Sequence, residues 1–242
     1  MEPAVTAPRR PATEPLLTLL VVLAAVTCVA TVQVIFLRAP TELSMGIVQK
    51  IFYFHVPSAY GMYLGATACF VGSALYLWRP GDRWDAVARA GAELAVLMGL
   101  IVMITGPLWA SKAWGRYWTW DPRLTTSLLS LLLYVAYLAL RVFGGRGDAE
   151  RRFAAALGVL GAANLPIIHL SVRKWGGQHP QVVTGSGGGL QHPDMKLALG
   201  LGFATFTLLV GALLAVRIRH HLAECRLAAL EQRALELELG PD

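Results

Sequence analysis

The chain has 242 residues, which is typical of one domain and at most of two. Hydrophobic residues make up 55 % of it, charged residues only 15 %, and the mean hydropathy is +0.53. A soluble globular domain has about 25 % charged residues. The composition therefore indicates an integral membrane protein and excludes a disordered chain and a disulfide-rich secreted scaffold. The net charge of +6 is typical of basic loops beside membrane lipid, and we expect no nucleic-acid partner.

Six apolar segments are each about long enough to span the roughly 30 Å hydrocarbon core of a membrane. They are residues 16–36, 57–78, 89–109, 124–143, 153–172 and 197–216. Because they are continuous and do not alternate, they predict helices and not the strands of a barrel. The predicted fold is all-α, a bundle of six transmembrane helices over residues 16–216. A disordered arm, 1–15, is expected before it and an amphipathic tail, 217–242, after it.

An even number of spans places both termini on one side of the membrane. The arm, the tail and the two short loops hold thirteen of the 21 Lys and Arg residues, and the three longer loops hold eight. Because these residues are enriched on the cytoplasmic side, we expect both termini in the cytoplasm and the longer loops outside. Long loops on a rigid scaffold commonly carry binding residues, so the external face is the expected functional face.

The predicted external loop, 110–123, is rich in aromatic and basic residues. Four of the seven Trp residues fall within residues 109–120. An aromatic belt at the membrane surface accounts for scattered Trp residues, but it requires neither Asp121 nor the neighbouring arginines. Flat aromatic rings beside cations suit a large, flat, anionic ligand, since arginine binds carboxylates with two hydrogen bonds. A porphyrin with its propionates is such a ligand.

Two histidines on the same predicted side are candidate iron ligands. His55 lies just before the second span, and we expect Pro57 in the first turn of that helix, which places His55 at the membrane surface. His179 lies in the loop between the fifth and sixth spans. A neutral imidazole nitrogen is a common axial ligand of haem iron.

The other histidines have weaker claims to a ligand role. We expect a polar packing role for His169, near the external end of the fifth span. His192 follows a glycine-rich stretch and is a reserve candidate for ligation. His220 and His221 lie in the predicted tail and are expected to be solvated.

The tryptophan segment and its flanks resemble a known family. The motif that begins at Trp114 resembles the WWD domain of the haem-handling proteins of cytochrome c biogenesis; its matching positions are Trp114, Gly115, Trp118, Trp120, Asp121 and Arg123. The segments 54–57 and 164–179 resemble the two histidine motifs that flank this domain. The length and the six-span layout resemble the short haem exporter C branch of the family.

The resemblance implies a binding and delivery role in the inner membrane of a bacterium. Haem b would be held non-covalently and transiently at the external face, with His55 and His179 as axial ligands. The motif residues named above would form a platform for haem and a docking surface for a periplasmic haem chaperone. An ABC transporter with two kinds of subunit and a small membrane peptide would assist. The candidate contacts to the propionates are Lys112, Arg116, Arg173 and Lys174.

Three other functions are less consistent with the sequence. A haem lyase or synthase subunit resembles the longer relatives, and this chain is short. A di-haem electron-transfer subunit would carry histidines within spans on both sides of the membrane. A permease would need ionisable groups at mid-membrane. No nucleophile with an adjacent base is apparent, so we expect no enzyme, and the three Cys residues form no Cys-x-x-Cys pair for covalent haem attachment.

Overall fold

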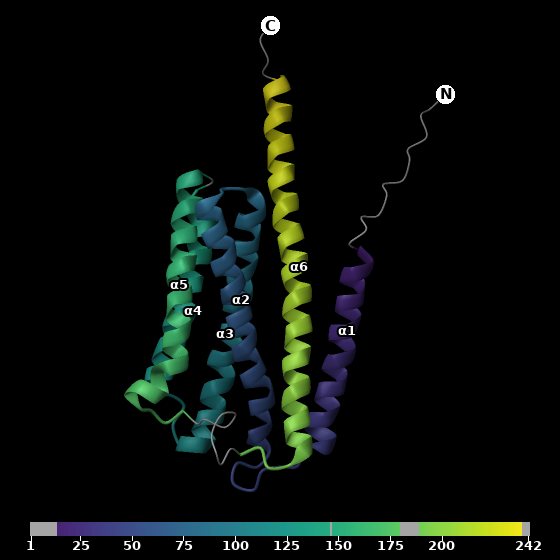
Figure 1. Cartoon of the computed structure of the whole chain (residues 1–242), viewed down its shortest axis with the longest axis vertical. Coiled ribbons are helices and arrows are strands. Elements are labelled where there is room, and N and C mark those ends of the chain that lie inside the picture. The colour runs from purple at the N-terminus through teal and green to yellow at the C-terminus, as the bar shows by residue number, and fades with distance from the viewer. Residues whose placement is uncertain (1–13, 146, 180–188, 239–242) are drawn as a thin grey trace, which may run out of the picture.

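The computed structural model describes residues 14–145, 147–179 and 189–238. Its helices are α1 (Glu14–Gln33), α2 (Phe52–Trp78), α3 (Asp82–Trp114), α4 (Pro122–Phe143), α5 (Asp148–Trp175) and α6 (Pro193–Glu238). A π-helical turn, Val34–Arg38, follows α1, and a 3-10 turn, Ile47–Ile51, precedes α2. Within the described residues six helices are long and apolar enough to cross a membrane, which confirms the predicted all-α architecture. The start of α1 and the end of α6 lie at the same end of the bundle (Figure 1).

Two helices are much longer than the apolar segments that predicted them. Helix α3 starts at Asp82, seven residues before the predicted span 89–109, and ends at Trp114. Gly115 follows it with a φ of +69°, which favours glycine. Helix α6 has 46 residues, about 69 Å at 1.5 Å per residue. As far as Glu238, the tail predicted at 217–242 is therefore a continuation of α6. Hydropathy marks only the membrane part, whereas Leu, Ala, Glu and Arg extend a helix into water because they favour helix.

The other helix ends move the predicted boundaries by a few residues. Helix α1 begins at Glu14, so the last two residues of the predicted arm are helical, and residues 1–13 lie outside the described part. Helix α2 begins at Phe52, so His55 lies within the helix and Pro57 lies in its second turn. The prediction of a proline in the first turn is therefore wrong. Helices α3 and α4 take up both ends of the predicted loop 110–123, which is reduced to residues 115–121.

Helices α2 and α3 approach so closely that their backbones touch. A Cβ atom at Gly65 would lie 2.6 Å from the backbone nitrogen of Ala95, and one at Gly91 would collide with the backbone nitrogen of Cys69. Small residues allow such contact between membrane helices, where close packing is the main attraction. The contact fixes the register of α2 on α3 and so holds the start of α2 beside the end of α3.

Buried ion pairs join the helices at the end where α6 leaves the bundle. Arg141 of α4 donates to Asp85 of α3 at 2.7 Å and to Glu150 of α5 at 2.9 Å, and all three side chains are buried. A buried cation that binds two carboxylates is costly to remove, because Glu150 would lose its counter-charge and Asp85 would keep only Arg151, 3.9 Å away. This cluster therefore locks α3, α4 and α5 together.

A second cluster places α6 against α3 and corrects one prediction. Glu93 accepts a hydrogen bond from Arg217 at 2.6 Å and lies 3.0 Å from the ring of His221. The other ring nitrogen of His221 lies 3.0 Å from Glu224. The prediction that His221 is solvated is wrong, since only 2 % of it is exposed. The continuous α6 carries this ring onto α3.

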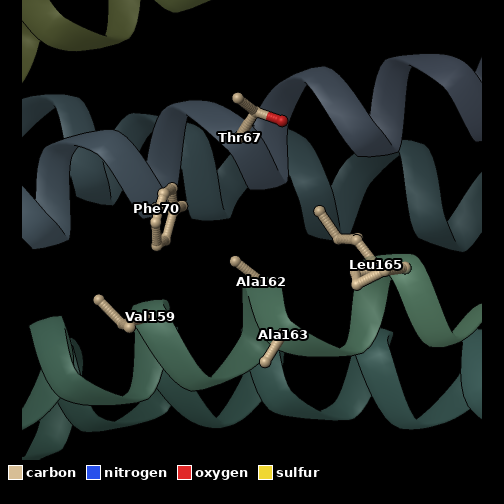
Figure 2. A pocket seen from close by; sticks show the side chains of 7 residues that line it. Thr67, Phe70, Val159, Ala162, Ala163 and Leu165 are labelled. Atoms are coloured by element: carbon tan, nitrogen blue, oxygen red, sulfur yellow. The ribbon is translucent and has the colours of Figure 1, made fainter.

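A pocket lies on the side of the bundle between α2 and α5 (Figure 2). Its lining has no charged side chain and none of the predicted site residues; it consists of Thr67, Phe70, Val159, Ala162, Ala163, Leu165 and Pro166. All seven lie near the middle of their helices. This pocket is therefore separate from the predicted ligands, which lie at the helix ends.

Candidate functional site

The predicted site residues gather at the end of the bundle opposite to the start of α1. The start of α2, the end of α3, the start of α4, the end of α5 and the start of α6 meet there, at the bottom of Figure 1. His55 comes from α2, the Trp segment from the end of α3 and the α3–α4 connection, and His179 from the segment after α5. The shared location follows from the up-and-down order of the helices.

His55 is oriented by a hydroxyl group of α3. Its Nδ1 lies 2.9 Å from the Oγ1 atom of Thr105. The single hydroxyl hydrogen of Thr105 is donated to the backbone oxygen of Ile101 at 2.6 Å, so toward His55 the hydroxyl oxygen accepts. The hydrogen of a neutral His55 therefore sits on Nδ1, and the lone pair is left on Nε2. In metal-binding histidines, a hydrogen bond from the ring nitrogen that does not bind the metal fixes the orientation of the ring.

Gly106 gives the His55 ring its place against α3. A Cβ atom at this position would lie 3.2 Å from Cε1 of His55, closer than side chains normally pack. Neither Thr105 nor Gly106 was among the predicted site residues. The only local signal is the polar, small and helix-breaking run Thr105-Gly106-Pro107 inside an otherwise apolar segment.

Asp121 joins the start of α4 to the segment that carries His179. One carboxylate oxygen accepts from the backbone N–H of Arg123 at 2.8 Å and so caps α4. The other oxygen accepts from the backbone N–H of Gln178 at 2.7 Å. Only 6 % of Asp121 is exposed. Asp121, which the sequence places in the predicted platform, is thus buried and bonded to the residue that precedes His179.

The lack of a side chain at Gly177 allows the Asp121 carboxylate to approach the backbone N–H of Gln178. Its φ of +144° lies in the region that favours glycine, and a Cβ atom there would collide with the Asp121 carboxylate. Glycine is therefore the residue that lets the chain after α5 turn tightly over the start of α4. This turn brings His179 back over the bundle.

His179 lies half-buried in the same local environment as His55. Its Nδ1 is buried and has no hydrogen-bond partner among the described protein groups. Burial lowers the pKa of His179 from 6.5 to about 4, and the positive charges of Arg123 and of a protonated His55 act in the same direction, whereas Asp121 opposes them. His179 is therefore a neutral imidazole at physiological pH, as a metal ligand must be.

The four Trp residues of the segment form two edge-to-face pairs. The rings of Trp109 and Trp114 lie 5.8 Å apart, and those of Trp118 and Trp120 lie 5.7 Å apart, both nearly perpendicular. Trp120 is 75 % exposed, whereas Trp118 is half-buried. The first pair packs at the end of α3, and the second presents an aromatic face beside the turn that Asp121 holds.

The predicted basic residues separate into two groups. Arg123 donates from Nε to the backbone oxygen of Ile168 and from Nη2 to that of His169, both at 3.3 Å, so its guanidinium ties α4 to the end of α5. The four candidate propionate contacts are exposed, and among the described residues none of them has an ion-pair partner: Lys112, Arg116, Arg173 and Lys174. They lie at the same end of the bundle as the site, at the end of α3, in the connection after it and at the end of α5.

Two further histidines, His169 and His192, lie at this end of the bundle. The side chain of His169 is exposed on α5, so the expected packing role of this side chain is wrong; its backbone oxygen is what Arg123 binds. His192 accepts from the backbone N–H of Asp194 at 3.2 Å, which caps the start of α6. Residues 180–188, which include most of the glycine-rich stretch, lie outside the described part.

Comparison with known proteins gives a consistent result. The family model described as "Heme exporter protein C" matches residues 5–233. Heme exporter protein C of Escherichia coli K12 is 36 % identical over 187 residues, which cover 75 % of this chain and 74 % of the relative. The proteins of the same name from Bradyrhizobium diazoefficiens and Paracoccus denitrificans are each 32 % identical and cover 83 % and 88 % of this chain, and 74 % and 89 % of their own lengths. With its six membrane-length helices, this chain is a multi-pass inner-membrane protein that belongs to the heme exporter protein C family.

Proposed function

We propose that this protein binds haem at the external face of the cytoplasmic membrane and delivers it to a periplasmic haem chaperone for cytochrome c maturation. Haem is the cargo, held without a covalent bond. The observation that supports the proposal is that two imidazoles, His55 and His179, lie close enough for their charges to interact, at the end of the bundle that also carries the tryptophan-rich segment (Figure 1). Thr105 leaves Nε2 of His55 free to bind iron, and Nδ1 of His179 is buried without a protein partner.

The two ligands are held with different firmness in this proposal. His55 sits on a helix that is locked to α3 by direct backbone contact, and it is oriented by Thr105. His179 sits on a connecting segment that is attached to α4 through Asp121 and the N–H of Gln178. We propose that His179 leaves the iron first when the haem is handed over, while His55 keeps it. The ABC transporter and the small membrane peptide implied by the family resemblance would take part in this release.

The chaperone would dock on the exposed aromatic face. Two coordinate bonds anchor the haem, whereas an edge-to-face aromatic contact contributes only about 0.5–1.5 kcal/mol beyond burial. Interfaces, in contrast, depend on a few aromatic anchors. Loss of one Trp should therefore weaken delivery more than it weakens binding. The exposed cations around the segment would guide the propionates.

The experiment measures haem content and delivery in the same preparation. Full-length Trp118→Ala protein is purified with its haem and mixed with the haem-free chaperone, and transfer is followed by absorption. We expect most of the haem to be retained and its transfer to be at least tenfold slower, whereas the neighbouring Tyr117→Ala variant, outside the motif, behaves as wild type. Haem loss from Trp118→Ala as complete as from a double histidine variant would refute the separate roles.

The proposal requires the site to face the periplasm. The excess of Lys and Arg on the opposite side supports cytoplasmic termini. Reporter fusions after Arg116 and after Arg146 should report opposite sides, with the first in the periplasm. Reports from the same side would overturn the arrangement.

A further inference from the structure

The end of α6 projects beyond the rest of the bundle as a single helix. In Figure 1 this helix extends past the ends of all its neighbours. Its last contacts with the bundle are made by residues 217–225, through Arg217, His221 and Glu224. Beyond them, Leu227, Leu230 and Leu237 are 58, 66 and 78 % exposed. Large apolar side chains exposed on a single helix are typical of a surface that packs against a partner.

The sequence of this segment has the seven-residue repeat of a coiled coil. Small and apolar residues recur at alternating steps of four and three, at Ala223, Leu227, Leu230, Ala234 and Leu237. This is the spacing of the two seam positions, a and d. The flanking positions are equally regular. An arginine precedes each of the two a positions, at Arg226 and Arg233, and a glutamate follows each of the three d positions, at Glu224, Glu231 and Glu238.

The apolar seam faces away from the rest of the chain. His221 marks the side that packs on α3, because it is buried against Glu93. Leu230 follows nine residues later, and at about 100° per residue it points about 180° away from His221. The seam is therefore open to a partner that approaches from outside the bundle.

The charges of the segment suit a second copy of the same helix. In a parallel pair, the arginine that flanks one seam faces the glutamate five residues further along the partner helix, as Arg226 faces Glu231. Within one helix these two residues are too far apart to pair, since pairs form three or four residues apart. Among the described residues neither has an ion-pair partner. An antiparallel pair would oppose arginine to arginine and glutamate to glutamate.

The membrane favours the parallel arrangement. Two copies inserted with the same topology send their α6 helices out of the same side and in the same direction. Confinement to one membrane also raises their effective concentration, so a short contact is sufficient. We propose that two copies of this protein associate through a parallel coiled coil of residues 223–238. This inference is independent of the haem-binding proposal.

Disulfide cross-linking of the full-length protein in membranes tests the pairing. In a Cys225→Ser background, Leu227→Cys places a thiol on the seam, and Gln232→Cys places one on the opposite, exposed side of the same helix. With a mild oxidant we expect at least five times more linked dimer from Leu227→Cys than from Gln232→Cys. Equal yields, no dimer, or linkage only to a different protein would overturn the proposal.

Charge exchange provides a second test that does not depend on folding of the bundle, because both positions are exposed. Added to the Leu227→Cys protein, Arg226→Glu should reduce the dimer yield at least threefold, since it opposes glutamate to Glu231. The further change Glu231→Arg recreates complementary pairs and should restore the yield. A double variant as poor as the single one would contradict the parallel pairing.

Discussion

The contact between Thr105 and His55 predicts that loss of the Thr105 hydroxyl weakens haem binding. Replacing Thr105 by Val keeps the size and branching of the side chain but removes the hydroxyl that accepts from Nδ1 of His55 at 2.9 Å. The Nδ1 hydrogen is then buried without an acceptor, which costs about 1–3 kcal/mol. The ring also loses the group that fixes its orientation and strengthens its Nε2 as a donor to iron.

The expected magnitude follows from the behaviour of such groups in metal sites. Loss of a partner to a metal-binding histidine typically lowers metal affinity about 10- to 100-fold, which corresponds to about 1.4–2.8 kcal/mol. Thr105→Val should weaken haem binding by this factor and raise the reduction potential of the bound haem, because a less basic imidazole stabilises the ferric state less. Thr105→Ser keeps the hydroxyl and should bind within about threefold of wild type.

The assay is haem titration of purified full-length protein, followed by a redox titration of the bound haem. The potential separates a change at the iron from a general loss of stability, which would not shift it. Equal affinity and equal potential in wild type and Thr105→Val would refute the argument that Thr105 orients His55.

Three further outcomes follow from other contacts. Gly177→Ala should displace the segment that carries His179, because its Cβ atom would collide with Asp121; the haem spectrum should shift toward that of a His179 variant, and an unchanged spectrum would contradict the role of the turn. Because the pKa of His179 is about 4, its imidazole stays neutral as the pH falls through 6.5. Haem should therefore remain bound from pH 7.5 to about 5.5 and be lost only near pH 4. Loss of haem centred on pH 6.5 would contradict the lowered pKa of His179. Arg141→Met should destabilise the fold by about 3–5 kcal/mol, since the buried Glu150 loses its cation and Asp85 keeps only the more distant Arg151; thermal unfolding in detergent should show no comparable loss for the exposed Arg152→Met.

The six helices could be predicted because an apolar run of about twenty residues has few other stable states in a cell. The helix ends could not, because hydropathy reports on the membrane and not on the helix. Asp82 and Trp114 lie outside the apolar part of α3, yet the backbone hydrogen bonds continue to both. His221 was misjudged for the same reason: its burial depends on α6 continuing past the membrane to Glu93.

The candidate site was predictable only where a motif marks it. His55, His179 and the Trp segment carry residue types that suit a porphyrin. Thr105, Gly106 and Gly177 act through contacts with residues far away in the sequence, and no local pattern assigns them a partner. The burial of Asp121 depends on the turn at Gly177, which only the folded chain shows.

The absorption spectrum of the purified protein tests the central claim most directly. Wild-type protein should carry low-spin haem with two imidazole ligands. His55→Gly and His179→Gly should each lose haem or become high-spin, and added imidazole should restore the low-spin spectrum because it fills the position left by the side chain. A His55→Gly or His179→Gly protein whose haem content and spectrum match those of wild type would contradict the claim that these two histidines hold the iron.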